Sequence, residues 1–115
     1  MITLYGIPNC DSIKKARLWL QAHNVDYRFH NYKSEGVPEK ELRNWIKQVG
    51  WEALLNKRGT TWRKLDDAAR ENLTQESSMQ LMLDSPGLIK RPVLDIDGKI
   101  TVGFSEDRYA QIRFP

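Results

Sequence analysis

The chain has a single cysteine, Cys10, among its 115 residues. No disulfide can form within it, which excludes the small secreted domains that disulfides hold together. No apolar run approaches the roughly 18 residues that cross a bilayer. The first five residues, Met1 to Tyr5, show neither a basic nor an apolar signal-peptide region. We therefore expect a cytoplasmic protein with no membrane partner.

The usual sequence patterns of metal and phosphate sites are also missing. His23 and His30 do not combine with Cys10 at the short spacing of a zinc site. The fragment Asp95-x-Asp97-Gly98 lacks the downstream ligands of a calcium loop, and no glycine-rich phosphate loop is present. We predict no metal and no bound cofactor.

Charge is only slightly unbalanced, with 18 basic and 15 acidic side chains mixed along the chain. Trp62 stands beside Arg63 and Lys64, but no basic stripe extends from them, so direct binding of nucleic acid is not expected. The length fits one domain, 1–115, and we expect a monomer.

The first third of the chain predicts a β-α-β unit. Residues 2–5 are β-prone and are followed by turn-forming residues at 6–9. Apolar residues then recur at helical spacing up to His23 and Asn24, and residues 25–32 alternate like a second strand. Two strands joined by a helix usually pair in parallel, which places Cys10 at the junction of loop and helix.

The remainder predicts helices followed by a hairpin. Pro38 suits the first position of a helix that Gly50 ends. We expect a turn at 52–55, a loop at 56–61, a short helix at 66–71 and a longer one at 74–84. Asp97-Gly98 between the strand-like runs 93–96 and 100–104 is a strong hairpin signal. Ser105 can cap a final helix, and the predicted class is α/β.

Cys10 is the candidate catalytic residue. Unpaired backbone N–H groups and the positive end of the helix dipole favour the thiolate at a helix start. The alternative is a small buried apolar residue, but the neighbours Asn9, Asp11 and Ser12 do not resemble a core segment. Ile13 occupies the position of a second redox cysteine, so a resolving thiol must come from outside, with glutathione as the obvious cytosolic candidate.

Four other residues are candidates for substrate or glutathione binding. Ser12 could donate a hydrogen bond to the sulfur or act as a helix cap. Arg91 could bind an anion or face water, and Pro92 could be cis, although an ordinary trans proline is favoured from the residues alone. Arg58, before Gly59, could reach the site or remain an exposed charge.

Several blocks of the sequence resemble the arsenate-reductase-like (ArsC) family, most closely its Spx/YffB-type branch. The blocks are Leu4 to Ser12, Lys14 to Arg17, Arg58 to Leu65 and Ile89 to Pro92. The resemblance implies a thioredoxin-like fold with a core of 1–33 and 88–115 and a helical insertion at 34–87. It also implies that Pro92 is cis.

Arsenate reductases of this family use one cysteine and three arginines that hold the oxyanion. Cys10 and Arg91 match two of these positions. The middle arginine would fall within 54–57, where this chain has Asn56, and the last within 101–104, which reads Thr-Val-Gly-Phe. Each missing charged hydrogen bond costs about 1.5–3 kcal/mol of anion binding, which argues against arsenate as the substrate.

The resulting hypothesis is a glutathione-dependent thiol oxidoreductase whose nucleophile is Cys10. Arg91 and Arg58 would hold a glutathione carboxylate, and the Pro92 backbone would pair with the peptide. One alternative is an arsenate reductase coupled to glutathione and glutaredoxin. Another is an Spx-like regulator that binds RNA polymerase without a disulfide switch, since Ile13 removes the second thiol.

Overall fold

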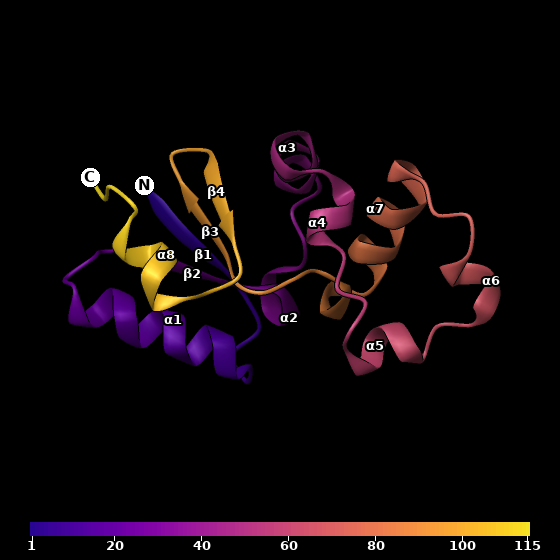
Figure 1. The fold of residues 1–115 in the computed structure, drawn as a ribbon, viewed down its shortest axis with the longest axis horizontal. Helices are drawn as coiled ribbons and strands as arrows, with labels where there is room; N and C mark the ends of the chain where they lie inside the picture. The colour runs from indigo at the N-terminus through magenta and orange to yellow at the C-terminus, as the bar shows by residue number, and fades with distance from the viewer. The chain divides into compact units, whose positions relative to one another are not determined.

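The computed structural model describes all 115 residues and divides into two compact units. One unit combines Met1–Gly36 with Arg91–Pro115, and the other is Val37–Lys90 (Figure 1). The family resemblance implies boundaries at 33/34 and 87/88, whereas the two units meet at 36/37 and 90/91. None of the helices has both the length and the apolar character needed to cross a bilayer.

The first unit contains a mixed four-stranded sheet in the order β2-β1-β3-β4. Its strands are β1 (Ile2–Gly6), β2 (Arg28–Asn31), β3 (Val93–Ile96) and β4 (Lys99–Val102). Its helices are α1 (Asp11–Ala22), α2 (Tyr32–Glu35) and α8 (Glu106–Ala110). β1 pairs in parallel with β2 and antiparallel with β3, which confirms the predicted β-α-β unit.

Helices α1 and α8 cover one face of this sheet (Figure 1). The buried cluster joins strand residues to both helices and consists of Ile2, Leu4, Ala16, Leu20, Leu94 and Tyr109. Strand residues two apart point to the same face, so Ile2 and Leu4 meet the apolar stripe of α1. Removing this surface from water fixes the helix that begins beside Cys10.

The β3–β4 hairpin follows its turn residues. Asp97 and Gly98 both have positive φ, 52° and 95°, as a two-residue hairpin turn of this type requires. β3 occupies the predicted residues, but β4 ends at Val102 rather than Phe104. Gly103, with φ of 80°, leaves the extended conformation, and its N–H donates to the Pro92 carbonyl at 2.8 Å.

The second unit is helical, with a core that includes the fully buried Leu42, Trp45 and Met82. Its elements are α3 (Glu39–Val49), α4 (Trp51–Leu54), α5 (Thr60–Arg63), α6 (Asp67–Arg70), α7 (Gln75–Asp84) and the 3₁₀ turn η1 (Pro86–Leu88). Helix α7 packs against α3, α4 and η1.

Several predicted boundaries were wrong for local reasons. The second strand covers only Arg28–Asn31, because Asn31 caps the short helix α2 and takes Tyr32 out of the strand. Pro38 is the N-cap of α3 rather than its first residue. The polar loop expected at 56–61 ends early, since Thr60 already begins α5.

Candidate active site

Cys10 lies directly before the first turn of α1. It is the N-cap residue with an extended backbone, φ −108° and ψ 132°, and its carbonyl accepts from the Lys14 N–H at 3.0 Å. No side chain caps this helix, so of the two roles expected for Ser12 the capping role was wrong. The free N–H groups of the first turn therefore point toward the Cys10 side chain.

Close packing below the loop holds this helix start in place. Gly6 ends β1 against the fully buried Ile13, whose Cδ1 would lie 2.1 Å from a side-chain Cβ at position 6. Only a glycine fits at this position without displacing Ile13. The residue in the resolving position of the motif is thus a core residue of the helix start.

The pKa of the Cys10 thiol is lowered from its ordinary value. Partial burial is the largest single effect and acts to raise the pKa. It is outweighed by a hydrogen bond from the Arg91 side chain, by the backbone N–H groups of Ile13 and Ser12, and by the charge of Arg91. The site therefore favours a half-buried thiolate, the form that attacks disulfides.

Arg91 reaches the thiol from the segment that leads into β3. The Arg91–Pro92 peptide bond is cis, so the trans proline favoured from the residues alone was wrong and the expectation from the family resemblance was right. Val93 pairs with Tyr5 of β1, which brings Arg91 and Pro92 to the same sheet edge as the Cys10 loop. The Pro92 carbonyl already accepts from Gly103, so a bound peptide would have to use its second lone pair.

The structure thus brings four of the five predicted site residues together: Cys10, Ser12, Arg91 and Pro92. Ser12 contributes its backbone N–H to the thiol. Arg58 belongs to the helical unit, where its N–H donates to Asn56 Oδ1 at 3.1 Å. Its part in ligand binding stays a prediction.

The positions of the two missing arginines are occupied by groups with other partners. Asn56 Oδ1 accepts the hydrogen bond from Arg58, and Gly103 has a positive φ that an arginine would adopt only with strain. Arg108 lies near Gly103, but its guanidinium donates to the carbonyls of Val102 and Gly103. The two family positions therefore carry no arginine, and the nearby Arg108 guanidinium is bonded to backbone carbonyls.

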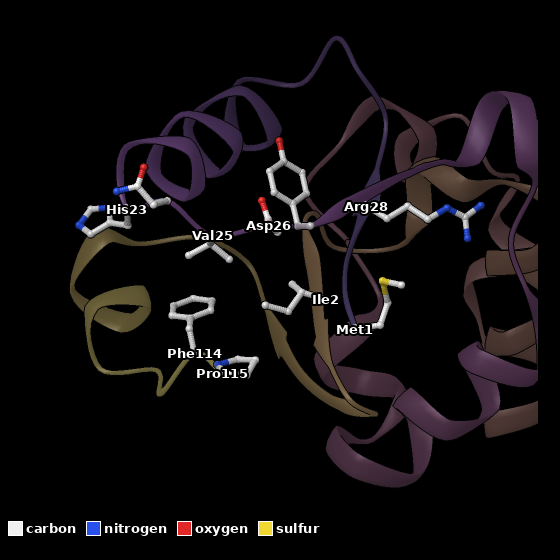
Figure 2. A pocket seen from close by; sticks show the side chains of 10 residues that line it. Met1, Ile2, His23, Val25, Asp26, Arg28, Phe114 and Pro115 are labelled. Carbon is white, nitrogen blue, oxygen red and sulfur yellow. The ribbon is translucent and has the colours of Figure 1, made fainter.

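Two cavities of the first unit differ in their relation to Cys10. One, of about 540 Å³, lies at the opposite end of β1, where Ile2, Val25 and Phe114 surround it (Figure 2). The other, of about 690 Å³, runs along α1 from Ser12 to His23 and is bordered by Phe104. The second includes Ser12, two residues after Cys10, but Cys10 itself lines neither cavity. No group of three or more His, Cys, Asp or Glu side chains is arranged to hold a metal.

One further side chain at this edge was not among the predicted site residues. Tyr32 directly follows β2, and β2 runs parallel to β1. Because parallel strands end at the same edge of a sheet, this topology was the available signal. The predicted second strand included Tyr32, so this signal could be used only once β2 was known to end at Asn31.

Comparison with known proteins agrees with this architecture. The ArsC family model matches residues 5–112. The solved structure of the YffB protein is 48% identical and covers 96% of each chain with a TM-score of 0.92. An arsenate reductase (ArsC)-related protein from Brucella melitensis is 51% identical, with 94% of this chain and 90% of that chain covered and a TM-score of 0.77.

The transcriptional regulators are more distant relatives. The global transcriptional regulator Spx of Staphylococcus epidermidis is 32% identical over 109 residues, which span 93% of this chain and 82% of Spx. The predicted α/β, thioredoxin-like fold and the predicted family are therefore confirmed. The chain belongs to the ArsC family.

Proposed function

We propose that this protein is a glutathione-dependent thiol oxidoreductase that works through Cys10. The observation that carries the proposal is the convergence of Arg91 and the Ser12 and Ile13 N–H groups on one half-buried thiol. These donors stabilise a thiolate, the nucleophile of thiol–disulfide exchange. Since the chain has no second cysteine, the resolving thiol is supplied by glutathione.

The reaction balances without any further oxidant or reductant. The Cys10 thiolate attacks the glutathione sulfur of a mixed disulfide, a new S–S bond forms, and the substrate sulfur leaves as a thiolate with the electron pair of the broken bond. A second glutathione thiolate then attacks the Cys10 adduct, which releases glutathione disulfide and restores the Cys10 thiolate. The substrate sulfur is reduced to a thiolate, and the glutathione taken from the mixed disulfide leaves with one free glutathione as glutathione disulfide.

The proposed ligand contacts follow from the chemistry of glutathione, which carries carboxylates beside its peptide bonds. Arg91 pairs with a carboxylate through a charge-assisted hydrogen bond, and Ser12 and Pro92 line the peptide. We place the reaction in the cytoplasm, where glutathione keeps thiols reduced. We further propose that the protein acts as a monomer on small disulfides. Glutaredoxin serves as an accessory reductant.

Intact-mass spectrometry tests the first step. The reduced chain is mixed with glutathione disulfide, and the adduct is then treated with excess glutathione. We expect one glutathione on the wild type, none on Cys10→Ser, and release of the adduct by glutathione. An exposed, reduced Cys10 that never acquires glutathione would rule out the proposal.

The Spx relatives support a second candidate of another kind, a regulator that binds RNA polymerase. The 32% identity to Spx extends over most of this chain, although Ile13 excludes a disulfide switch. Co-purification of RNA polymerase with the tagged chain, retained in Cys10→Ser, would favour this role. Arsenate reduction is a weaker candidate, and turnover no higher than that of Cys10→Ser would exclude it.

A further inference from the structure

Tyr32 lies at the sheet edge that carries the reactive thiol. It is the first residue of α2 and directly follows β2, whose last residue, Asn31, pairs with Gly6 at the end of β1. The loop from Gly6 leads to Cys10, and Arg91 precedes the strand that pairs on the other side of β1. All three side chains therefore belong to one end of the same sheet.

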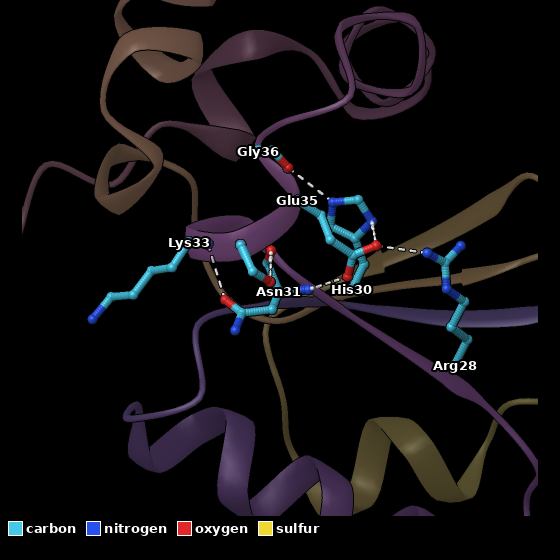
Figure 3. Close-up of polar contacts among 7 residues, drawn as sticks. Arg28, His30, Asn31, Lys33, Glu35 and Gly36 are labelled. Atoms are coloured by element: carbon cyan, nitrogen blue, oxygen red, sulfur yellow. Dashed lines mark hydrogen bonds and ion pairs between the residues drawn. The ribbon is translucent and has the colours of Figure 1, made fainter.

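Hydrogen bonds hold the backbone in place before and after Tyr32 (Figure 3). Asn31 Oδ1 accepts from the Lys33 N–H at 2.9 Å, and Glu35 Oε2 accepts from the Asn31 N–H at 3.2 Å. At the end of α2, the His30 ring nitrogen Nε2 contacts the Gly36 carbonyl at 2.8 Å. Such a short helix has little stability alone, so these bonds hold Tyr32 in position.

The Tyr32 hydroxyl is buried and has no hydrogen-bond partner. The residue is only 2% exposed, and its ring packs 6.4 Å from that of Tyr5 and 6.0 Å from that of His30. Burial and Tyr5 raise the pKa of Tyr32, whereas the charge of Arg91 acts in the opposite direction. The hydroxyl is therefore a neutral donor within electrostatic reach of the guanidinium that bonds to Cys10. A buried polar group without a partner costs stability and calls for an explanation.

We propose that the Tyr32 hydroxyl is a ligand-binding group of the Cys10 site, which donates to the carboxylate that Arg91 pairs with. The site otherwise presents donors: the guanidinium, with its five N–H groups, and the N–H groups of Ser12 and Ile13. A carboxylate accepts hydrogen bonds at both oxygens and so complements an arginine and a tyrosine together.

In this proposal, the buried Tyr32 hydroxyl is uncovered in the course of the reaction. When Cys10 enters a mixed disulfide it loses its negative charge, and Arg91 loses the thiolate to which it donates. The guanidinium can then turn to the incoming carboxylate, and Tyr32 gains its partner in the same movement. The ligand is glutathione, so this step rests on the proposed function.

The test compares Tyr32→Phe with Tyr109→Phe. The Tyr109 hydroxyl is also buried without a partner, but its ring packs against Trp19 and Phe104 in the core between the sheet and the helices. Both changes remove one hydroxyl and keep the ring, so neither should reduce the free energy of unfolding.

The covalent arm measures the equilibrium of adduct formation with glutathione disulfide and with uncharged 2-hydroxyethyl disulfide. We expect Tyr32→Phe to disfavour the glutathione adduct roughly tenfold, the scale of a hydrogen bond to a charged group, and to leave the 2-hydroxyethyl adduct unchanged. Tyr109→Phe should change neither. An equal effect of Tyr32→Phe on both adducts, or no effect on either, would overturn the inference.

The non-covalent arm separates this inference from the proposed reaction. S-methylglutathione, which cannot form a disulfide, is titrated into Cys10→Ser with and without Tyr32→Phe. Weaker binding to the double variant supports the role of Tyr32 even if the wild type forms no mixed disulfide, in which case only the proposed reaction fails. Equal binding to the two variants, or no binding to Cys10→Ser, contradicts the inference.

Discussion

At the scale of single residues, the chemistry depends on how Arg91 and two backbone N–H groups offset the burial of Cys10. Burial favours the neutral thiol, and the three donors favour the thiolate. The backbone donors come with the helix start, whereas the charge comes from one side chain that the sheet topology delivers. The contribution of Arg91 can therefore be removed without disturbing the helix.

Arg91→Gln should raise the pKa of Cys10, because it removes a cation and its charge-assisted hydrogen bond while a shorter polar side chain remains. The rate of alkylation by iodoacetamide across a pH series reports this pKa. Arg17→Gln is the matched control, since Arg17 lies on α1 but donates to the Tyr27 hydroxyl at 2.9 Å. A Cys10 titration that is the same in Arg91→Gln and wild type would contradict the assigned role of Arg91.

Ile13→Cys should convert the site to a two-thiol site. The Ile13 N–H already bonds to the Cys10 sulfur, so a thiol at position 13 starts close to it. We expect a loss of roughly 1–3 kcal/mol in stability from the smaller buried side chain. Glutathione disulfide should then produce an internal disulfide in place of a lasting adduct, as seen by intact mass. A stable glutathione adduct on the double-cysteine chain would be the opposite result.

The site residues were not equally predictable from the sequence. Cys10 was indicated by its position before a helical pattern, a purely local signal. From the residues alone Arg91 was open between binding an anion and facing water, and only the family resemblance favoured the first, since its partner is distant in the chain. Tyr32 was missed because its place at the site depends on both the parallel pairing of β2 with β1, which was predicted, and the end of β2, which was not. Capping of α1 was one of two roles open to the Ser12 hydroxyl, but the N-cap is Cys10, two residues earlier.

At the scale of elements, α2 shows how a few side-chain bonds set the position of a functional residue. Its four residues follow a cap at Asn31 and end at Gly36, which has φ of 75°. Arg28 also supports the turn, since it donates to Glu35 Oε1 at 2.6 Å.

Asn31→Ala should destabilise the protein by about 0.5–2 kcal/mol, the usual cost of losing an N-cap. It should also weaken the glutathione adduct, because α2 positions Tyr32. Thr74→Ala is the control, since Thr74 caps α7 in the helical unit and makes a capping box with Ser77. Urea unfolding and the adduct equilibrium check both effects. If both variants lost the same stability and neither changed the adduct equilibrium, α2 would have no part in ligand binding.

The elements that could be predicted are those with local chemical signals. Asp97-Gly98 encodes its hairpin through the backbone conformations that these residues tolerate, and Gly50 ends α3 with φ of 85°. The helices α2, α4 and α5 have four residues each. One turn is too short for an apolar periodicity, so caps and tertiary packing decide these segments, and neither is visible in the residue pattern.

At the scale of the whole molecule, the ionisation of Cys10 is linked to stability. A pKa that is lower in the folded than in the unfolded chain means that the unfolded chain binds more protons between the two values. The stabilising contribution is complete above the unfolded value of about 8.5 and is lost as the pH falls through the folded value. The free energy of unfolding of the wild type, minus that of Cys10→Ser, should therefore rise with pH across this window.

Urea titrations of both chains over a pH series check this linkage. Arg91→Gln should narrow the pH window, because it moves the folded pKa toward the unfolded one. A difference between wild type and Cys10→Ser that stays constant with pH would mean that folding does not favour the thiolate.

The role of the Cys10 thiolate is tested by the rate at which the wild-type chain acquires glutathione from glutathione disulfide, measured as a function of pH. We expect one adduct, on Cys10, with a rate that levels off below the ordinary cysteine pKa of about 8.5. No adduct at Cys10, or a rate that keeps rising through that pH as it does for an unassisted thiol, would show that Cys10 is not an activated nucleophile.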